Sequence, residues 1–114
     1  MHRLNYTMYE GKVDRDTEDR VWVGKEENVQ HLAQLIVDKL ERDRYLKSQD
    51  EPWLDLACIG WSSLNQAVKA IAVARELVGP GKHDLVMQPA FSTIVDFAEQ
   101  ERTRIILRVF RVKT

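Results

Sequence analysis

The chain contains very little cysteine and no long hydrophobic run. Cys58 is the only cysteine among 114 residues, so no internal disulfide can form, and a reducing cytoplasm is the compartment we expect. No stretch approaches the roughly 18 consecutive apolar residues that a membrane-spanning helix needs. The first residues also lack the apolar core of a secretion signal. We therefore expect a cytoplasmic protein with no membrane partner.

The residue patterns that build enzyme active sites are also scarce. His2, His31 and His83 are the only histidines, and no cysteine or acid stands near them at metal-ligand spacing. Ser62 and Ser63 lack the Gly-x-Ser-x-Gly surroundings of a hydrolase nucleophile. No Walker loop and no dinucleotide-binding glycine motif is present. We expect no catalytic residue, no metal site and no cofactor, and therefore a protein that is not an enzyme.

The chain has almost no net charge. Seventeen Lys and Arg residues face eighteen Asp and Glu residues, for a net charge of −1, which argues against coating of nucleic acid through bulk charge. The distribution is uneven, because the segment 101–114 holds five basic residues and one acid. An anionic partner is expected at that segment. The alternative is that these charges only solvate an edge strand and prevent aggregation.

Length and apolar spacing predict one domain, residues 20–114, after an N-terminal extension, residues 1–19. Within the extension, Leu4, Tyr6 and Met8 occupy alternate positions. Alternation of this kind is typical of a strand. The extension can therefore add a strand to the domain or cover an open sheet face.

The domain itself predicts the order strand, helix, strand, helix, strand, strand. Pro89 inside the fifth of these elements predicts an edge position or a bulge there, and Ile94 and Val95 can extend that strand toward its hairpin turn. A polar connection is expected from Tyr45 to Pro52. The predicted elements are a strand at Val21–Val23, a helix from an Asn28 N-cap to Glu41 or Arg44, a strand at Leu54–Ile59, a helix capped by Ser62 or Ser63 and stopped by Gly79, Pro80 and Gly81, and strands at Leu85–Phe91 and Thr103–Val112.

This order predicts an α/β fold, a two-layer sandwich in which two helices cover one face of a mixed four-stranded sheet. In the last strand, Ile105, Leu107 and Val109 share the face that should meet the helices. The other face is then open, and its mixture of apolar and basic side chains is typical of a surface for a partner or a second subunit. Its residues in the last strand are Arg104, Ile106, Arg108 and Phe110.

The start of the second helix is a candidate anion site. Asn65, Gln66 and Lys69 gather there on the polar side of the helix, where free backbone N–H groups favour negative charge. Trp61, in the turn just before, can stack on a base or a sugar. The alternative is that Trp61 packs over the helix end and that Lys69 is a solvated lysine.

Several short motifs along the domain resemble those of a known family. They are Ile59–Gly60, Leu64–Arg75, Asp84–Val86, Pro89–Phe91 and Glu101–Thr103. From about residue 20 to residue 112 the pattern resembles the stage V sporulation protein S family, a bacterial branch of the Alba superfamily. The resemblance implies an Alba-like domain in a bacterial regulatory or developmental protein. It also implies nucleic acid as the ligand and a homodimer or higher oligomer as the assembly.

The resemblance further implies which positions would meet nucleic acid. In the Alba superfamily, the loop after the first strand, the start of the second helix and the last hairpin contact nucleic acid, with basic side chains on the phosphates. The loop here, residues 24–28, has one base and two acids, so we expect weak binding with little base specificity. With Trp61 added from its chemistry, the expected nucleic-acid-binding residues are Lys25, Trp61, Asn65, Gln66, Lys69, Arg102, Arg104 and Arg108.

A second hypothesis is a protein assembly or regulatory module that does not bind nucleic acid. In this interpretation the open sheet face, where Ile106 and Phe110 alternate with Arg104 and Arg108, binds another protein or a second copy of the chain. The near-zero net charge suits such a role. The two functions are compatible with each other.

Overall fold

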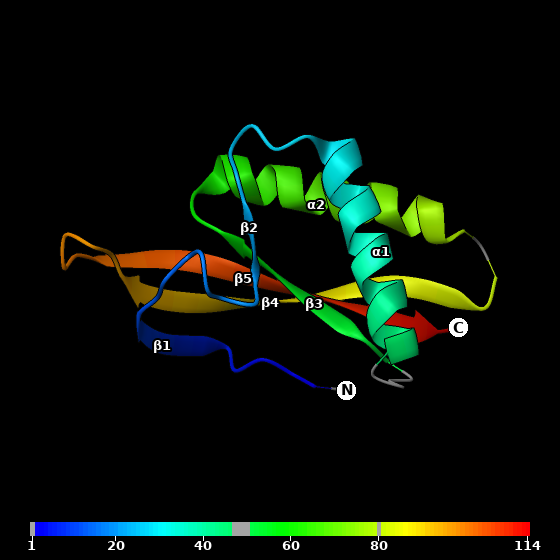
Figure 1. Cartoon of the computed structure of the whole chain (residues 1–114), viewed down its shortest axis with the longest axis horizontal. Helices are drawn as coiled ribbons and strands as arrows, with labels where there is room; N and C mark the ends of the chain where they lie inside the picture. Colours follow the sequence, from blue (N-terminus) through cyan, green and yellow to red (C-terminus); the bar gives the residue numbers. More distant parts are fainter. Residues whose placement is uncertain (1, 47–50, 80) are drawn as a thin grey trace.

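The computed structural model describes residues 2–46, 51–79 and 81–114. Its elements form one mixed sheet in the strand order β1-β4-β5-β3-β2, with two helices (Figure 1). The sheet has five strands, so the predicted α/β class is confirmed and the predicted number of four strands is wrong. The elements are β1 (Thr7–Lys12), β2 (Val21–Val23), α1 (Val29–Leu46), β3 (Trp53–Cys58), α2 (Trp61–Val78), β4 (His83–Val95) and β5 (Glu101–Lys113).

The helix α1 connects β2 to β3, which are parallel neighbours. The side-chain oxygen of Asn28 accepts a hydrogen bond from the backbone N–H of His31 at 3.0 Å, so the predicted N-cap is confirmed. The helix continues to Leu46, beyond the predicted end at Glu41 or Arg44. Within the predicted connection that follows, residues 47–50 lie outside the described residues, as does Pro80 after α2.

The helix α2 begins one residue after Gly60, whose φ of 82° is in the left-handed region that favours glycine. The predicted cap at Ser62 or Ser63 is wrong, because no side chain caps this helix. Ser63 lies inside the first turn, and its hydroxyl donates to the carbonyl oxygens of Ile59 at 2.8 Å and Gly60 at 3.1 Å. The predicted end is confirmed, since Gly79 closes the helix by donating its N–H to the carbonyl oxygen of Arg75.

The strands β4 and β5 form a hairpin of two 13-residue strands. Its turn is held by Asp96, whose side-chain oxygen accepts from the backbone N–H groups of Ala98 at 2.9 Å and Gln100 at 3.0 Å. Ile94 and Val95 belong to β4, as the sequence predicted. The hairpin is longer than predicted and projects past the start of α2 (Figure 1).

Pro89 lies in β4 opposite Leu107, in an unbroken register with β5. The N–H of Phe91 donates to the carbonyl oxygen of Tyr6 at 2.9 Å. Because amide directions alternate along a strand, the nitrogen of Pro89 points to the same side. Pairing of β1 with β4 begins only at Thr7 and Phe91, so Pro89 lies where this side of β4 has no strand partner. The predicted edge position is confirmed at this residue, and the alternative of a bulge in β4 is not.

The hydrophobic core lies between the sheet and both helices, which cover the same face (Figure 1). Leu107 and Val109 of β5 are buried in it, as predicted, and Ile105 packs at its border. The small residues of α2 that are buried in this core are Ala67, Ala70 and Ala74. Neither described helix is apolar enough over its length to cross a membrane.

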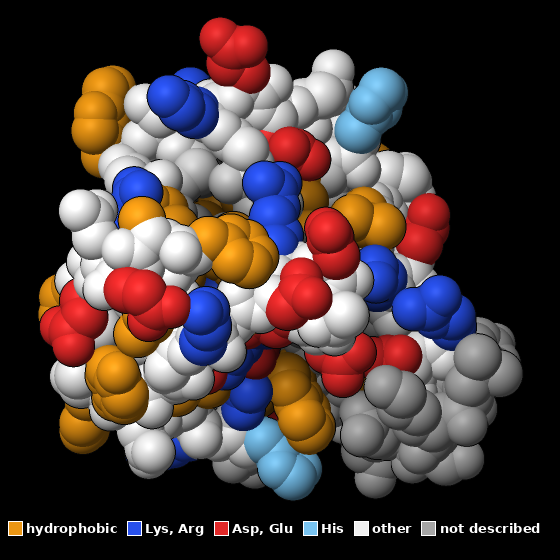
Figure 2. Space-filling view, turned by 60° about the vertical axis from the view of Figure 1, so that its left-hand side comes forward, with side chains coloured by type: hydrophobic (Ala, Val, Ile, Leu, Met, Phe, Trp, Pro, Cys, Tyr) orange, Lys and Arg blue, Asp and Glu red, His pale blue; other side chains and the backbone are white. Residues whose placement is uncertain are grey.

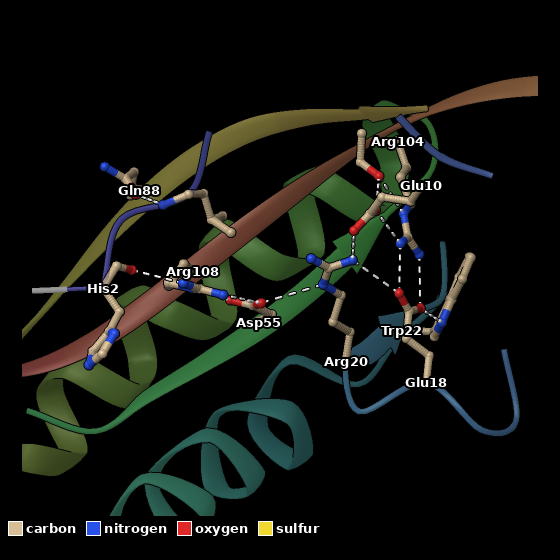
Figure 3. A network of polar contacts seen from close by, with 11 residues as sticks. His2, Glu10, Glu18, Arg20, Trp22, Asp55, Gln88, Arg104 and Arg108 are labelled. Atoms are coloured by element: carbon tan, nitrogen blue, oxygen red, sulfur yellow. Dashed lines mark hydrogen bonds and ion pairs between the residues drawn. The ribbon is translucent and has the colours of Figure 1, made fainter. Parts of the chain in front are cut away.

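The other sheet face is covered, and the prediction that it is open is wrong. Ile106 and Phe110 are 0% and 1% exposed. Residues 2–20 run along this side of the sheet and insert β1 as an edge strand parallel to β4 (Figures 1 and 3). Both roles considered for the extension, an added strand and a cover, are therefore confirmed. The interface predicted at Ile106 and Phe110 is not available on the surface.

Candidate nucleic-acid interface

Three segments that are distant in the sequence meet around one pocket at the end of the molecule where α2 begins. They are the loop after β2, the first turn of α2 and the start of β5. The pocket has a volume of about 460 Å³. Lys25, Trp61 and Arg102, all predicted site residues, line it together. The structure thus brings together one predicted residue from each of the three segments.

The cations of this pocket are free of acidic partners. Lys25 and Arg102 are exposed, and neither forms an ion pair with any described residue. A third cation, Arg15, lines the same pocket and also lacks an ion pair within the described part of the chain. Sequence reasoning missed Arg15, because no residue pattern in the N-terminal extension indicated which part of the domain it contacts. These three side chains can meet phosphate groups without first breaking an ion pair with a described residue.

Trp61 is the aromatic member of the pocket, and its side chain is largely in solvent, at 78% exposure. The alternative that it packs over the helix end is therefore wrong. An indole of this exposure has free faces for stacking. Among the described residues no side chain caps α2, so no cap occupies the first backbone N–H groups of this helix, whose first turn lines the pocket through Ser62 and Ser63.

The remaining predicted residues of α2 divide into two kinds. Asn65 and Lys69 are exposed and follow Trp61 at intervals of four residues, so they continue from the pocket along the same side of the helix. Gln66 is occupied, because its Nε2 donates to the carbonyl oxygen of Glu27 at 2.8 Å. Gln66 therefore holds the loop of Lys25 against α2 and is a positioning residue.

Arg104 is not a surface cation. Its side chain is 0% exposed, and its guanidinium donates to Glu18 at 2.7 and 2.9 Å, to Glu10 at 2.8 Å and to the hydroxyl of Ser92 at 3.0 Å. The ring of Trp22 lies 4.9 Å from its Cζ. The predicted contact of Arg104 with phosphates is thus contradicted by its burial and by the carboxylates that already bind it.

Arg108 is held in a similar way on the same sheet face. Its guanidinium makes a bidentate pair with Asp55, at 2.7 and 2.8 Å, and donates to the carbonyl oxygen of His2 at 2.8 Å. It lies over the ring of Trp53, with its Cζ 5.1 Å from the ring centroid. Arg20 joins the two sites, since it contacts Asp55 at 3.4 Å and also binds both glutamates around Arg104.

These contacts form one arginine–carboxylate network that joins residues 2–20 to the sheet (Figure 3). Burial alone would raise the pKa of Glu10, but hydrogen bonds from Ser92, Arg104 and Arg20 outweigh it and hold this pKa at about 2. The pKa of Glu18 is lowered for the same reason, chiefly by Arg104 against the effect of burial. The network consists of Arg20, Arg104 and Arg108 with Glu10, Glu18 and Asp55, so its charges balance.

The model of one protein family matches this chain. The match is to stage V sporulation protein S (SpoVS) and covers residues 20–112. The chain belongs to the stage V sporulation protein S family. The resemblance noted from the motifs is thereby confirmed, and membership of the Alba superfamily is consistent with the fold. Membership implies a sporulation-related regulatory role.

Within this family member, the pocket uses residues of the matched domain together with one residue from outside it. Lys25, Trp61 and Arg102 lie within the matched range, and Arg15 precedes it. Figure 2 brings this end of the molecule forward and shows Lys and Arg side chains interspersed with acidic and hydrophobic ones. The surface is mixed in character and not uniformly basic.

Other groups with reactive side chains do not add to the site. Cys58 is buried in the core, and burial raises the pKa of its thiol to about 12, which keeps it protonated and unreactive. Among residues 2–46, 51–79 and 81–114, no three His, Cys, Asp or Glu side chains lie close enough together to hold a metal ion.

Proposed function

We propose that this stage V sporulation protein S family member is a nucleic-acid-binding regulatory protein that contacts phosphates with little base specificity. It acts by binding and not as an enzyme. The observation that carries the proposal is the pocket at the start of α2, where Lys25 and Arg102, which form no ion pair within the described part of the chain, lie beside an exposed Trp61. Positive charge next to an aromatic platform is the combination that single-stranded nucleic acid requires.

The two kinds of side chain have separate tasks in this proposal. Lys25, Lys69 and Arg102 bind phosphates and provide affinity that depends on salt. Trp61 stacks on a base, which every base permits because each has an aromatic face. Asn65, exposed one turn after Trp61, is placed to form a hydrogen bond with a base or a sugar. Single strands are favoured over duplexes, because stacking needs a base that is not already paired.

The number of available cations sets the expected affinity for nucleic acid. With Arg104 and Arg108 occupied by carboxylates, the three cations Lys25, Lys69 and Arg102 can neutralise about three phosphates. The log–log dependence of affinity on salt should then have a slope of about −2 for a single strand and about −2.7 for duplex DNA. Slopes this shallow correspond to weak binding, as the near-zero net charge predicts.

The test is fluorescence anisotropy of labelled single-stranded RNA, single-stranded DNA and duplex DNA across a salt series. We expect micromolar binding of single strands that weakens with salt and weakens further in Lys25→Ala, Lys69→Glu and Arg102→Ala. Lys113→Ala is the control, because Lys113 is exposed at the opposite end of β5. Absence of binding at low salt, or equal losses in the control, would contradict the proposal.

A second candidate function, self-association, is favoured by one separate observation. An apolar groove of about 370 Å³ lies on the helix side of the sheet and is lined by Tyr6, Pro89, Phe91 and Ile105. Tyr6 and Phe91 are 89% and 56% exposed, and exposed apolar surface of this kind suits a second copy of the chain. Light scattering should give a dimer mass for the native protein and a monomer mass for Phe91→Ser. A monomer mass for both would reject this function.

A further inference from the structure

Arg15 connects the N-terminal segment, residues 2–19, to the pocket at the start of α2. This segment precedes the residues that match the family, yet Arg15 lines the pocket beside Lys25, Trp61 and Arg102. The Cζ of Arg15 lies 5.7 Å from the centroid of the Trp22 ring, a cation–π contact that keeps the guanidinium on this side of the sheet.

A short turn presents Arg15 at this place. The carbonyl oxygen of Asp14 accepts from the N–H groups of Thr17 at 3.2 Å and Glu18 at 3.1 Å. The carboxylate of Asp14 accepts from the N–H of Asp16 at 2.9 Å. These bonds fix the backbone on both sides of Arg15 while they leave its side chain exposed.

The turn is fastened to the domain at its two ends by the arginine–carboxylate network. Before it, Glu10 binds Arg104 and Arg20; after it, Glu18 binds Arg104, Arg20 and the indole N–H of Trp22, the last at 2.8 Å. Trp22 therefore contacts Glu18 through its nitrogen and Arg15 through its ring. Trp22 thus links Arg15 to Glu18.

We infer that the N-terminal segment completes the phosphate-binding pocket by supplying Arg15, and that Glu18 is a positioning residue for it. The inference rests on the proposed function, since it adds a cation to the same site. The ligand chemistry is the phosphate backbone of a single-stranded nucleic acid. With Arg15 included, the pocket holds three free cations from three separate parts of the chain, the N-terminal segment, the loop after β2 and β5.

The opposite role for the segment would be that of a competitor, with Glu10 and Glu18 occupying arginines that a phosphate would otherwise bind. The geometry favours completion of the pocket. Arg104 lies beneath the ring of Trp22 with no side-chain exposure, and its donors are used by two carboxylates and a hydroxyl. The glutamates neutralise a buried charge, whereas the side chain of Arg15 is exposed and has no acidic partner among the described residues.

Two variants of the segment separate these roles in an anisotropy measurement with a labelled oligouridylate. Arg15→Ala should weaken binding by roughly three- to tenfold and make the salt slope shallower by about 0.7, the contribution of one phosphate. Arg3→Ala is the matched control, because Arg3 is exposed in the same segment and does not line this pocket. It should bind as the native protein does.

The second arm tests positioning with Glu18→Gln, which keeps the size of the side chain and removes its charge. It should weaken binding, and the double variant with Arg15→Ala should bind no more weakly than Arg15→Ala alone. Circular dichroism at the assay temperature verifies that each variant is folded. Arg3→Ala, as a folded control, separates a loss of affinity caused at the pocket from a loss caused by any change of charge in the segment.

Each outcome decides the inference. Loss of affinity in Arg15→Ala with no loss in Arg3→Ala supports it. Native affinity in Arg15→Ala, while Arg102→Ala still weakens binding, would overturn it and leave the proposed function standing. Tighter binding by Glu18→Gln would overturn it in favour of the competitor role. If the native protein bound no oligonucleotide at low salt, the proposed function and the inference would fail together.

Discussion

Gln66 on α2 donates a hydrogen bond from Nε2 to the carbonyl oxygen of Glu27, 2.8 Å away. This single contact holds the loop that carries Lys25 against α2, the helix that begins at Trp61. It crosses 39 positions of the sequence and joins two of the three segments that form the candidate site. The candidate site thus depends on a side chain that does not itself line the pocket.

Replacement of Gln66 by alanine should therefore loosen the loop without unfolding the domain. We expect a loss of about 1 kcal/mol of unfolding free energy, the usual contribution of one hydrogen bond, and weaker binding of single-stranded RNA. Urea denaturation and anisotropy measure the two effects. Asn65→Ala is the neighbouring control for stability, because Asn65 is exposed; equal destabilisation by both variants would contradict the positioning role of Gln66.

Arg104 should be essential for stability, although it was expected to bind ligand. Its replacement by methionine leaves Glu10 and Glu18 without their buried partner, and loss of one member of a buried ion pair costs about 3 kcal/mol. Arg102→Ala, two residues earlier on the same strand, should cost less than about 0.5 kcal/mol, because Arg102 is exposed. Urea midpoints compare the two variants, and a similar loss in both would refute the structural role of the network.

Stability should fall in acid because of Glu10. Its pKa in the folded protein is about 2, below its ordinary value of 4.5. A group with a lowered folded pKa contributes stability that is complete above 4.5 and is lost as the pH falls toward 2. Urea unfolding at a series of pH values should show this loss, and Glu10→Gln should have a flatter profile over the same range. Parallel profiles would show that Glu10 does not contribute.

Phe110→Glu should unfold the domain, although the sequence placed Phe110 on an open face that binds a partner. Phe110 is 1% exposed, so the new carboxylate would be buried without a partner. Val86 is its cross-strand neighbour on β4 and is exposed. Val86→Glu should therefore leave the circular dichroism spectrum and the melting temperature nearly unchanged. A folded Phe110→Glu protein would show that this sheet face is accessible after all.

The sequence predicted those elements whose signals are local. The Asn28 cap, the glycine at the end of α2 and the apolar spacing of both helices were read correctly because each depends on a few neighbouring residues. The start of α2 was misplaced. Gly60 is the N-cap residue and has no side chain to form a cap, whereas a serine in the same turn is a residue type that usually caps helices.

Contacts between residues that are distant in the sequence could not be predicted from local patterns. Nothing local in residues 2–19 indicates that Glu10 and Glu18 pair with an arginine more than eighty positions away. The sheet face that was predicted to be open is therefore buried in the structure. Arg104 was predicted to bind the ligand, although it lies in this buried face. Arg15 was missed for the same reason. The three segments that form the pocket were nevertheless identified, because the family resemblance supplied a relation that spacing alone could not.

The most direct test of the central claim is the position of the ligand on the protein. Proton–nitrogen NMR spectra of the labelled protein, recorded during titration with an oligouridylate, should show shifts of the backbone signals of Lys25, Gly60 and Arg102 and of the Trp61 indole. Signals at the opposite end of β5, such as Lys113, should remain in place. Shifts confined to the groove of Phe91, or no shifts at saturating ligand, would contradict the account.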